Sequence, residues 1–216
     1  MNFIDEELYF EASNLANRIC EEVASEFDIP IHKVKNVHIK RYMEQVKNIA
    51  FIDVSFGDHL DNLLLGSISK VFGEIIISIN KTMIWERRLF TCMHEIGHFY
   101  FDLDSLNAGN QLTDMMNEDG YLPDDLPREF RANVTASVLM SNDSALRFSI
   151  QKFNSFNKIA EYFCMSKSAL RVRLTEYLIY HFNCSPNYSY QLVNDFVYSD
   201  GREFRKIINK KSIQLM

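Results

Sequence analysis

Glycine and proline are scarce in this chain, with 7 and 4 residues among 216. Both residues mark turns and loops, so a sequence this poor in them is expected to be mostly helical, with rather little sheet. Apolar residues make up 47% of the chain and charged residues 24%, which is close to the average of globular proteins and excludes a disordered or fibrous chain. The length allows one large domain or two small ones.

The sequence also lacks the segments that direct a protein to a membrane. No apolar run approaches the roughly 18 residues that a membrane span needs, and the first residues are acidic where a secretory signal would be basic and then apolar. The four cysteines lie far apart, without a CxxC pair. These absences predict a cytoplasmic protein that has no membrane partner and whose thiols are reduced and mostly buried.

Charge is distributed unevenly along the chain. Residues 1–150 contain 13 Lys and Arg against 24 Asp and Glu, whereas residues 151–216 contain 10 against 5. An acidic body followed by a basic C-terminal region indicates either a polyanionic or acidic partner, or only a solvated surface with uneven charge.

Hydrophobic periodicity predicts an α+β fold that is mostly helical, with a small antiparallel or mixed sheet. Helices are expected at 6–27, 38–48, 83–101 and about 127–140, and further short helices at 144–181 and 190–211. Strands are expected at 50–56, 63–69 and 74–80, the last two joined by a turn at Phe72–Gly73. The acidic stretch 102–126 is expected to be a long loop with room for one helical turn.

The segment His94-Glu95-Ile96-Gly97-His98 has the pattern HExxH. Histidines at positions i and i+4 lie about 40° apart around a helix, so both imidazoles can reach one metal ion. Glu95 is about 100° from His94, close enough to hold a water beside the metal without ligating it. Apolar flanks on a helical period place the motif on a buried helix. We therefore interpret it as a metal site rather than as a pair of core histidines.

A catalytic zinc ion needs three protein ligands and one open position, so a third ligand must come from later in the chain. Asp104 would complete an extended HExxH pattern, but that pattern needs a glycine where this chain has Phe101. The better candidate is Glu129, at the start of the next predicted helix. Asn133 shares the helix face of Glu129 and either braces a ligand through a hydrogen bond or simply packs between helices.

Three segments, in this order and spacing, resemble the ImmA/IrrE family of bacterial metallopeptidases. They are IISIN at 76–80, RRLFTCMHEIGH at 87–98 and EFRAN at 129–133. The resemblance covers residues 10–140 and implies a zincin-like metallopeptidase domain. It also implies roles for four residues: His94, His98 and Glu129 as zinc ligands, and Glu95 as the catalytic base. Two histidines and a glutamate can also hold manganese.

Proteins of this family cleave helix-turn-helix transcriptional repressors and so relieve repression. The resemblance thus implies a zinc-dependent endopeptidase that cleaves such a repressor at a specific site. Too few residues follow Tyr180 for the GAF-like domain of the damage-response branch, so we expect the short anti-repressor type of phages and mobile elements. The alternative is a non-catalytic module, with a structural metal, that binds a repressor or an antitoxin-like partner.

The segment 156–174 itself resembles a helix-turn-helix, with Ser166 as the N-cap of its second helix. Lys167, Arg171 and Arg173 on that helix make DNA contact conceivable. The overall acidity of the chain favours packing or repressor binding over DNA recognition, so contact with DNA stays an open alternative.

These observations predict two domains. Residues 1–143 are expected to form the zincin-like metallopeptidase domain. Residues 144–216 are expected to form a helical, helix-turn-helix-like region. Its basic tail, REFRKIINKK at 202–211, could contact an acidic partner, DNA or only water.

Overall fold

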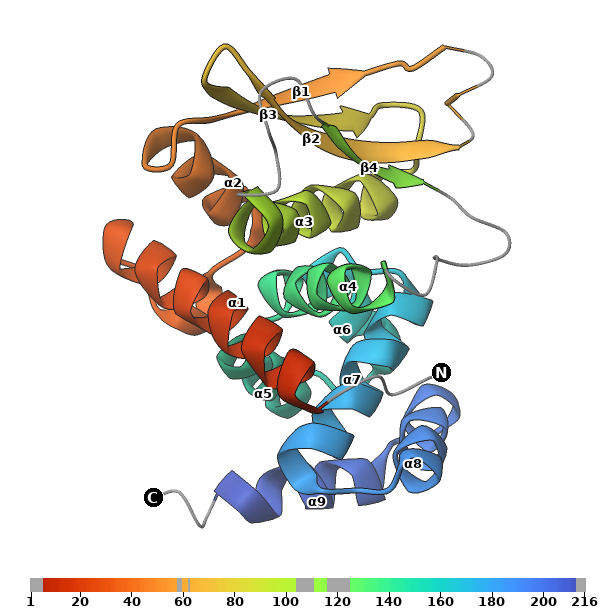
Figure 1. Cartoon of the computed structure of the whole chain (residues 1–216). Coiled ribbons are helices and arrows are strands. Elements are labelled where there is room, and N and C mark those ends of the chain that lie inside the picture. Colours follow the sequence, from red (N-terminus) through yellow and green to blue (C-terminus); the bar gives the residue numbers. More distant parts are fainter. Residues whose placement is uncertain (1–5, 58–59, 62, 104–110, 116–124, 213–216) are drawn as a thin grey trace. The chain divides into compact units, whose positions relative to one another are not determined.

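A computed structural model describes residues 6–57, 60–61, 63–103, 111–115 and 125–212. The chain divides into two compact units, residues 1–142 and 143–216 (Figure 1). Helices dominate the described residues and are accompanied by one small sheet, which confirms the predicted α+β, mostly helical fold. None of the described helices combines the length and the apolar character that a membrane crossing requires.

The sheet of the first unit has four strands in the order β1-β3-β2-β4 and is mixed. β1 (Ile49–Val54) is parallel to β3 (Glu74–Asn80). β2 (Leu64–Val71) is antiparallel both to β3 and to β4 (Gln111–Met115). Phe72 and Gly73, between β2 and β3, both have positive φ, as a tight hairpin turn requires. The three predicted strands and their turn are confirmed.

The strand β4 lies inside the stretch 102–126, so the prediction of a loop is wrong for residues 111–115. The backbone of β4 pairs with β2 between Leu64 and Ser69. A strand of five residues has too little periodicity to be recognised from sequence. Its pairing instead satisfies the backbone groups along the edge of β2. Asp104, the weaker ligand candidate, lies outside the described residues.

The helices of the first unit lie on one side of the sheet (Figure 1). They are α1 (Glu6–Glu26), the short 3-10 helix η1 (Ile31–Lys33), α2 (Asn36–Gln45), α3 (Trp85–Asp102) and α4 (Leu126–Met140). α3 packs against the sheet, α4 packs against α3, and α1 packs against α4. The four predicted helices of this region therefore exist, with ends within three residues of the predicted ones.

Two glycines set how closely α3 approaches its neighbours. A Cβ atom on Gly97 would lie 3.0 Å from the Cα atom of Ala132 on α4, nearer than the ~3.5–4.0 Å at which carbon atoms pack best. A Cβ atom on Gly66 in β2 would lie 2.6 Å from Thr91 Cγ2 and 2.8 Å from Glu95 Oε1. The helix that bears the HExxH motif is thus held tightly between β2 and α4.

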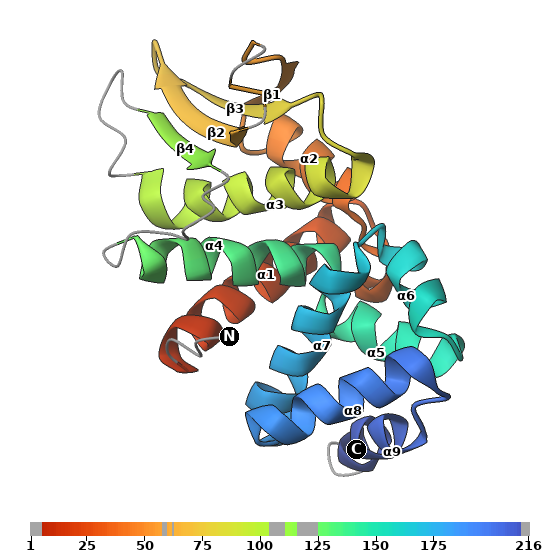
Figure 2. The ribbon, with the colours of Figure 1, turned by 90° about the vertical axis from the view of Figure 1, so that its right-hand side faces the viewer.

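Helices are the only regular secondary structure among the described residues of the second unit (Figure 2). Its helices are α5 (Asp143–Lys152), α6 (Phe156–Phe163), α7 (Lys167–Phe182), α8 (Pro186–Tyr198) and α9 (Arg202–Ser212). α8 packs against α7, and α9 packs against α8. The prediction of several short helices is confirmed except that α7 is 16 residues long and α8 begins at Pro186, four residues earlier than expected.

α6 and α7 form the predicted helix-turn-helix-like pair. α6 ends at Phe163 and is followed by Cys164 as its C-cap, whose φ of 53° lies in the left-handed region. Ser166 caps α7, because its hydroxyl accepts a hydrogen bond from the Ala169 backbone N–H at 3.1 Å. Six positions of this segment match the spacing of a helix-turn-helix core. Ala169 is partly exposed, and the other five are buried: Ile159, Ala160, Phe163, Leu170 and Leu174.

Candidate metal centre

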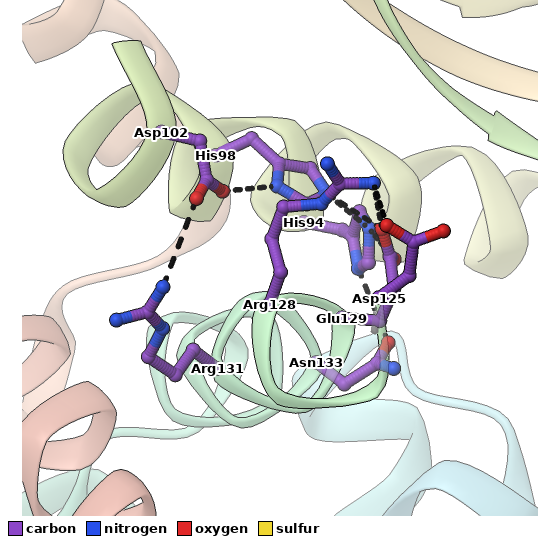
Figure 3. Close-up of polar contacts among 8 residues, drawn as sticks. All are labelled: His94, His98, Asp102, Asp125, Arg128, Glu129, Arg131 and Asn133. Atoms are coloured by element: carbon purple, nitrogen blue, oxygen red, sulfur yellow. Dashed lines mark hydrogen bonds and ion pairs between the residues drawn. The ribbon is translucent and has the colours of Figure 1, made fainter. Parts of the chain in front are cut away.

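Three buried residues from two helices converge in the first unit (Figure 3). His94 and His98 come from α3, and Glu129 comes from α4. The two histidine Nε2 atoms are 2.9 Å apart. Glu129 Oε2 lies 3.3 Å from His94 Nε2, and Glu129 Oε1 lies 3.7 Å from His98 Nε2. The structure therefore brings together the three residues that the sequence indicates as ligands.

Local sequence explains why these side chains meet. His94 and His98 are one helical turn apart and so share a face of α3. Glu129 lies in the first turn of α4, whose second residue is Pro127. A carboxylate at this end of a helix is stabilised by the helix dipole. The close contact between Gly97 and Ala132 then sets the distance between the two helices at the site.

Each imidazole has a second partner at its other ring nitrogen. Asn133 Oδ1 lies 3.1 Å from His94 Nδ1, and Asp102 Oδ2 lies 2.7 Å from His98 Nδ1. An amide oxygen and a carboxylate oxygen both accept hydrogen bonds, so Nδ1 donates in each pair. Each ring then has its lone pair on Nε2, which faces Glu129.

This donor set fits a divalent cation. Two Nε2 lone pairs 2.9 Å apart, next to a buried carboxylate, repel one another unless positive charge lies between them. Two histidines and one glutamate are also a ligand set of catalytic zinc sites, which leave one coordination position open. His94, His98 and Glu129 are the residues that would hold the ion.

The pKa values of the site depend on the same contacts. Burial alone would lower the pKa of the His98 imidazole, but hydrogen bonds to Asp102 and Glu129 outweigh it and raise that pKa. Burial alone would raise the pKa of the Glu129 carboxyl, but hydrogen bonds that His94 and His98 donate when they are protonated hold that pKa well below the usual range. The site therefore strongly favours an ionised carboxylate beside positive charge.

Sequence reasoning missed Asp102, although a signal was present. Asp102 follows His98 by four residues and so lies on the same face of α3. Arg131 on α4 extends the contact: its guanidinium is 3.7 Å from Asp102 Oδ1 and 3.4 Å from Glu11 Oε2 on α1. The same guanidinium lies 4.8 Å from the centre of the Phe101 ring. Three helices thus contribute to the position of the His98 ring.

Glu95, the predicted base, is fully buried on α3 beside His94. Its Oε1 atom lies against Gly66 in β2, so the carboxylate is held between the helix and the sheet. Cys92 is also buried, and burial raises the pKa of its thiol to about 12. All four cysteines are free, but Cys164 and Cys184 are partly exposed, so the expectation of burial holds for only two.

The basic side chains considered for DNA contact lie on α7 in the second unit. Arg171 donates a hydrogen bond to Asn194 Oδ1 on α8 at 2.6 Å. Arg173 is fully buried and forms an ion pair with Asp143. Lys167 is exposed. Two of the three basic groups are therefore engaged inside the second unit.

The fold and the buried donor set are those of a metallopeptidase-type hydrolase. A family model described as the IrrE N-terminal-like domain, a peptidase family, matches residues 60–175. This match covers more than half of the chain, so the chain belongs to that family, and the likeness inferred from its motifs is confirmed. No curated protein matches the chain at a significant level.

Proposed function

We propose that this protein is a zinc-dependent endopeptidase that cleaves a helix-turn-helix transcriptional repressor at a specific site and so relieves repression. The observation that supports the catalytic part is the convergence of His94, His98 and Glu129 in a buried site next to Glu95. The family to which the chain belongs supports the peptidase class. The repressor as substrate follows from the likeness to anti-repressor proteins of phages and mobile elements.

The residues present can perform peptide hydrolysis. A divalent cation held by the three ligands supplies Lewis acidity, which acidifies water and polarises a carbonyl group. The Glu95 carboxylate accepts a proton from the attacking water as the water oxygen bonds to the carbonyl carbon. The same carboxyl group then donates that proton to the amine nitrogen as the C–N bond breaks. Asn133 and Asp102 hold the two imidazoles in the orientation that directs Nε2 to the ion.

Narrow specificity is expected from docking of a folded partner. A cytosolic regulator must reject most proteins, and discrimination of this kind comes from contacts outside the reacting bond. The active site would then accept one exposed segment of the bound repressor.

The test is to find whether an adjacent gene encodes a small helix-turn-helix protein, to mix that protein with the zinc-loaded enzyme and to analyse the mixture by mass spectrometry. We expect two fragments whose masses add up to that of the substrate plus one water. Glu95→Gln should retain zinc and slow cleavage by about 10²–10⁴-fold. Glu86→Gln, a matched change in the first turn of the same helix, should cleave normally. A partner that binds but stays intact would instead favour the non-catalytic binding module.

A further inference from the structure

Peptide hydrolysis places negative charge on the carbonyl oxygen of the substrate, and the proposed function needs a group that stabilises it. Two other candidates, Tyr100 on α3 and Arg131 on α4, have partners away from the three ligands. The Tyr100 hydroxyl points to Met43 Sδ, 3.9 Å away. The Arg131 guanidinium interacts with Asp102 and Glu11. Tyr121 lies outside the described residues.

Unlike Tyr100 and Arg131, Arg128 lies beside a ligand of the candidate metal site. It precedes the ligand Glu129 on α4, and Figure 3 shows its side chain extending from the helix towards the imidazole and carboxylate groups. Its Nη2 atom is 3.5 Å from Glu129 Oε1 and 3.1 Å from Asp125 Oδ1. The Arg128 side chain is 33% exposed, whereas that of Glu129 is 6% exposed. The Arg128 guanidinium therefore lies beside the buried donor set and is more exposed to solvent than the Glu129 carboxylate next to it.

Arg128 also has donor capacity to spare. Its Nε atom is buried and, like the Nε atoms of Arg88 and Arg131, makes no hydrogen bond to any part of the chain that the structure describes; of the three, only Arg128 lies beside a ligand carboxylate. An unpaired buried N–H group is costly, and its cost is recovered when an acceptor arrives. A guanidinium binds oxyanions particularly well, because its donors are fixed in one plane and always charged.

We propose that Arg128 donates hydrogen bonds to the negative oxygen that develops on the scissile carbonyl, an inference that rests on the proposed peptidase function. Arg128 stays protonated throughout and exchanges no proton with the substrate. Its positive charge has a second consequence, because a cation 3.5 Å from a ligand oxygen opposes the binding of a divalent ion there. Arg128 thus weakens metal binding while it assists catalysis.

This pair of effects of opposite sign gives a test that does not depend on turnover. In competition with a chromogenic chelator, Arg128→Gln should bind zinc about three- to tenfold more tightly than the unmodified protein, because an unfavourable charge has been removed. Arg88→Gln is the matched control, since the Arg88 guanidinium pairs with Asp53 on β1. It should bind zinc normally. Zinc affinity that is unchanged or weaker in Arg128→Gln would overturn the proposal.

A second measurement uses a tetrahedral anion as the probe. Phenylphosphonate is titrated into the cobalt-loaded protein and followed by the visible absorption of cobalt, with neutral imidazole as the comparison ligand. Arg128→Gln should bind phenylphosphonate at least about tenfold more weakly and imidazole with unchanged affinity, and Arg128→Lys should be intermediate. Equal phenylphosphonate affinity in Arg128→Gln and Arg88→Gln would overturn the proposed role of Arg128. It would leave the proposed peptidase function standing. Failure of the unmodified protein to bind cobalt would overturn the proposed metallopeptidase function and this inference with it.

Discussion

Replacement of Gly97 by alanine should move α4 away from α3 and weaken the metal site without changing any ligand. The added Cβ atom would lie 3.0 Å from Ala132 Cα and 3.3 Å from Thr135 Cβ. Carbon atoms pack best at ~3.5–4.0 Å, so the helices must separate by about half an ångström. Metal–ligand distances tolerate only about 0.2 Å. We therefore expect zinc affinity to fall by about tenfold, at the lower end for changes that disturb ligand placement.

The free energy of unfolding of the metal-free protein should fall by no more than about 2 kcal/mol, since two effects oppose one another. Overpacking costs about 1–3 kcal/mol, and the better helix propensity of alanine recovers about 1 kcal/mol. Ala132→Gly is the control, because it alters the same helix contact without a clash. Chelator competition and urea unfolding of both variants separate affinity from stability. The reasoning is refuted if Gly97→Ala binds zinc as tightly as the unmodified protein.

Two further predictions concern charged groups on α3 and α7. Asp102→Asn should weaken zinc binding by about 10–100-fold in chelator competition, and unchanged affinity would show that Asp102 does not support the His98 ring. Burial raises the pKa of the Glu176 carboxyl from 4.5 to about 7, although Arg173 acts to lower it. The native state therefore holds this proton more tightly than the unfolded chain does, and the free energy of unfolding should fall by about 3 kcal/mol as the pH rises from about 4.5 to about 7. In urea titrations between pH 5 and pH 8, the free energy of unfolding should fall less for Glu176→Gln than for the unmodified protein. An equal fall in the two proteins would contradict a raised pKa of the Glu176 carboxyl.

The predictions from sequence were most accurate where short-range periodicity decides the structure. The spacing of His94 and His98 places them on one helix face whatever surrounds that helix, and Ser166 caps α7 through a contact only three residues away. The strand β4 was missed because its pairing with β2 is a long-range property. Asp102 is four residues after His98, so helical periodicity also predicts that it lies beside that ring.

The sequence by itself determined the helical character of the chain, the HExxH face of α3 and the capped pair α6 and α7, since each depends on residues within about one or two helical turns. Only the tertiary structure decided which groups surround the site. The approach of α4 to α3 brings Glu129 and Asn133 to the histidines, and the same packing leaves the Arg128 guanidinium beside the ligands. Such contacts depend on how two distant segments pack, and no pattern within either segment specifies the distance between them.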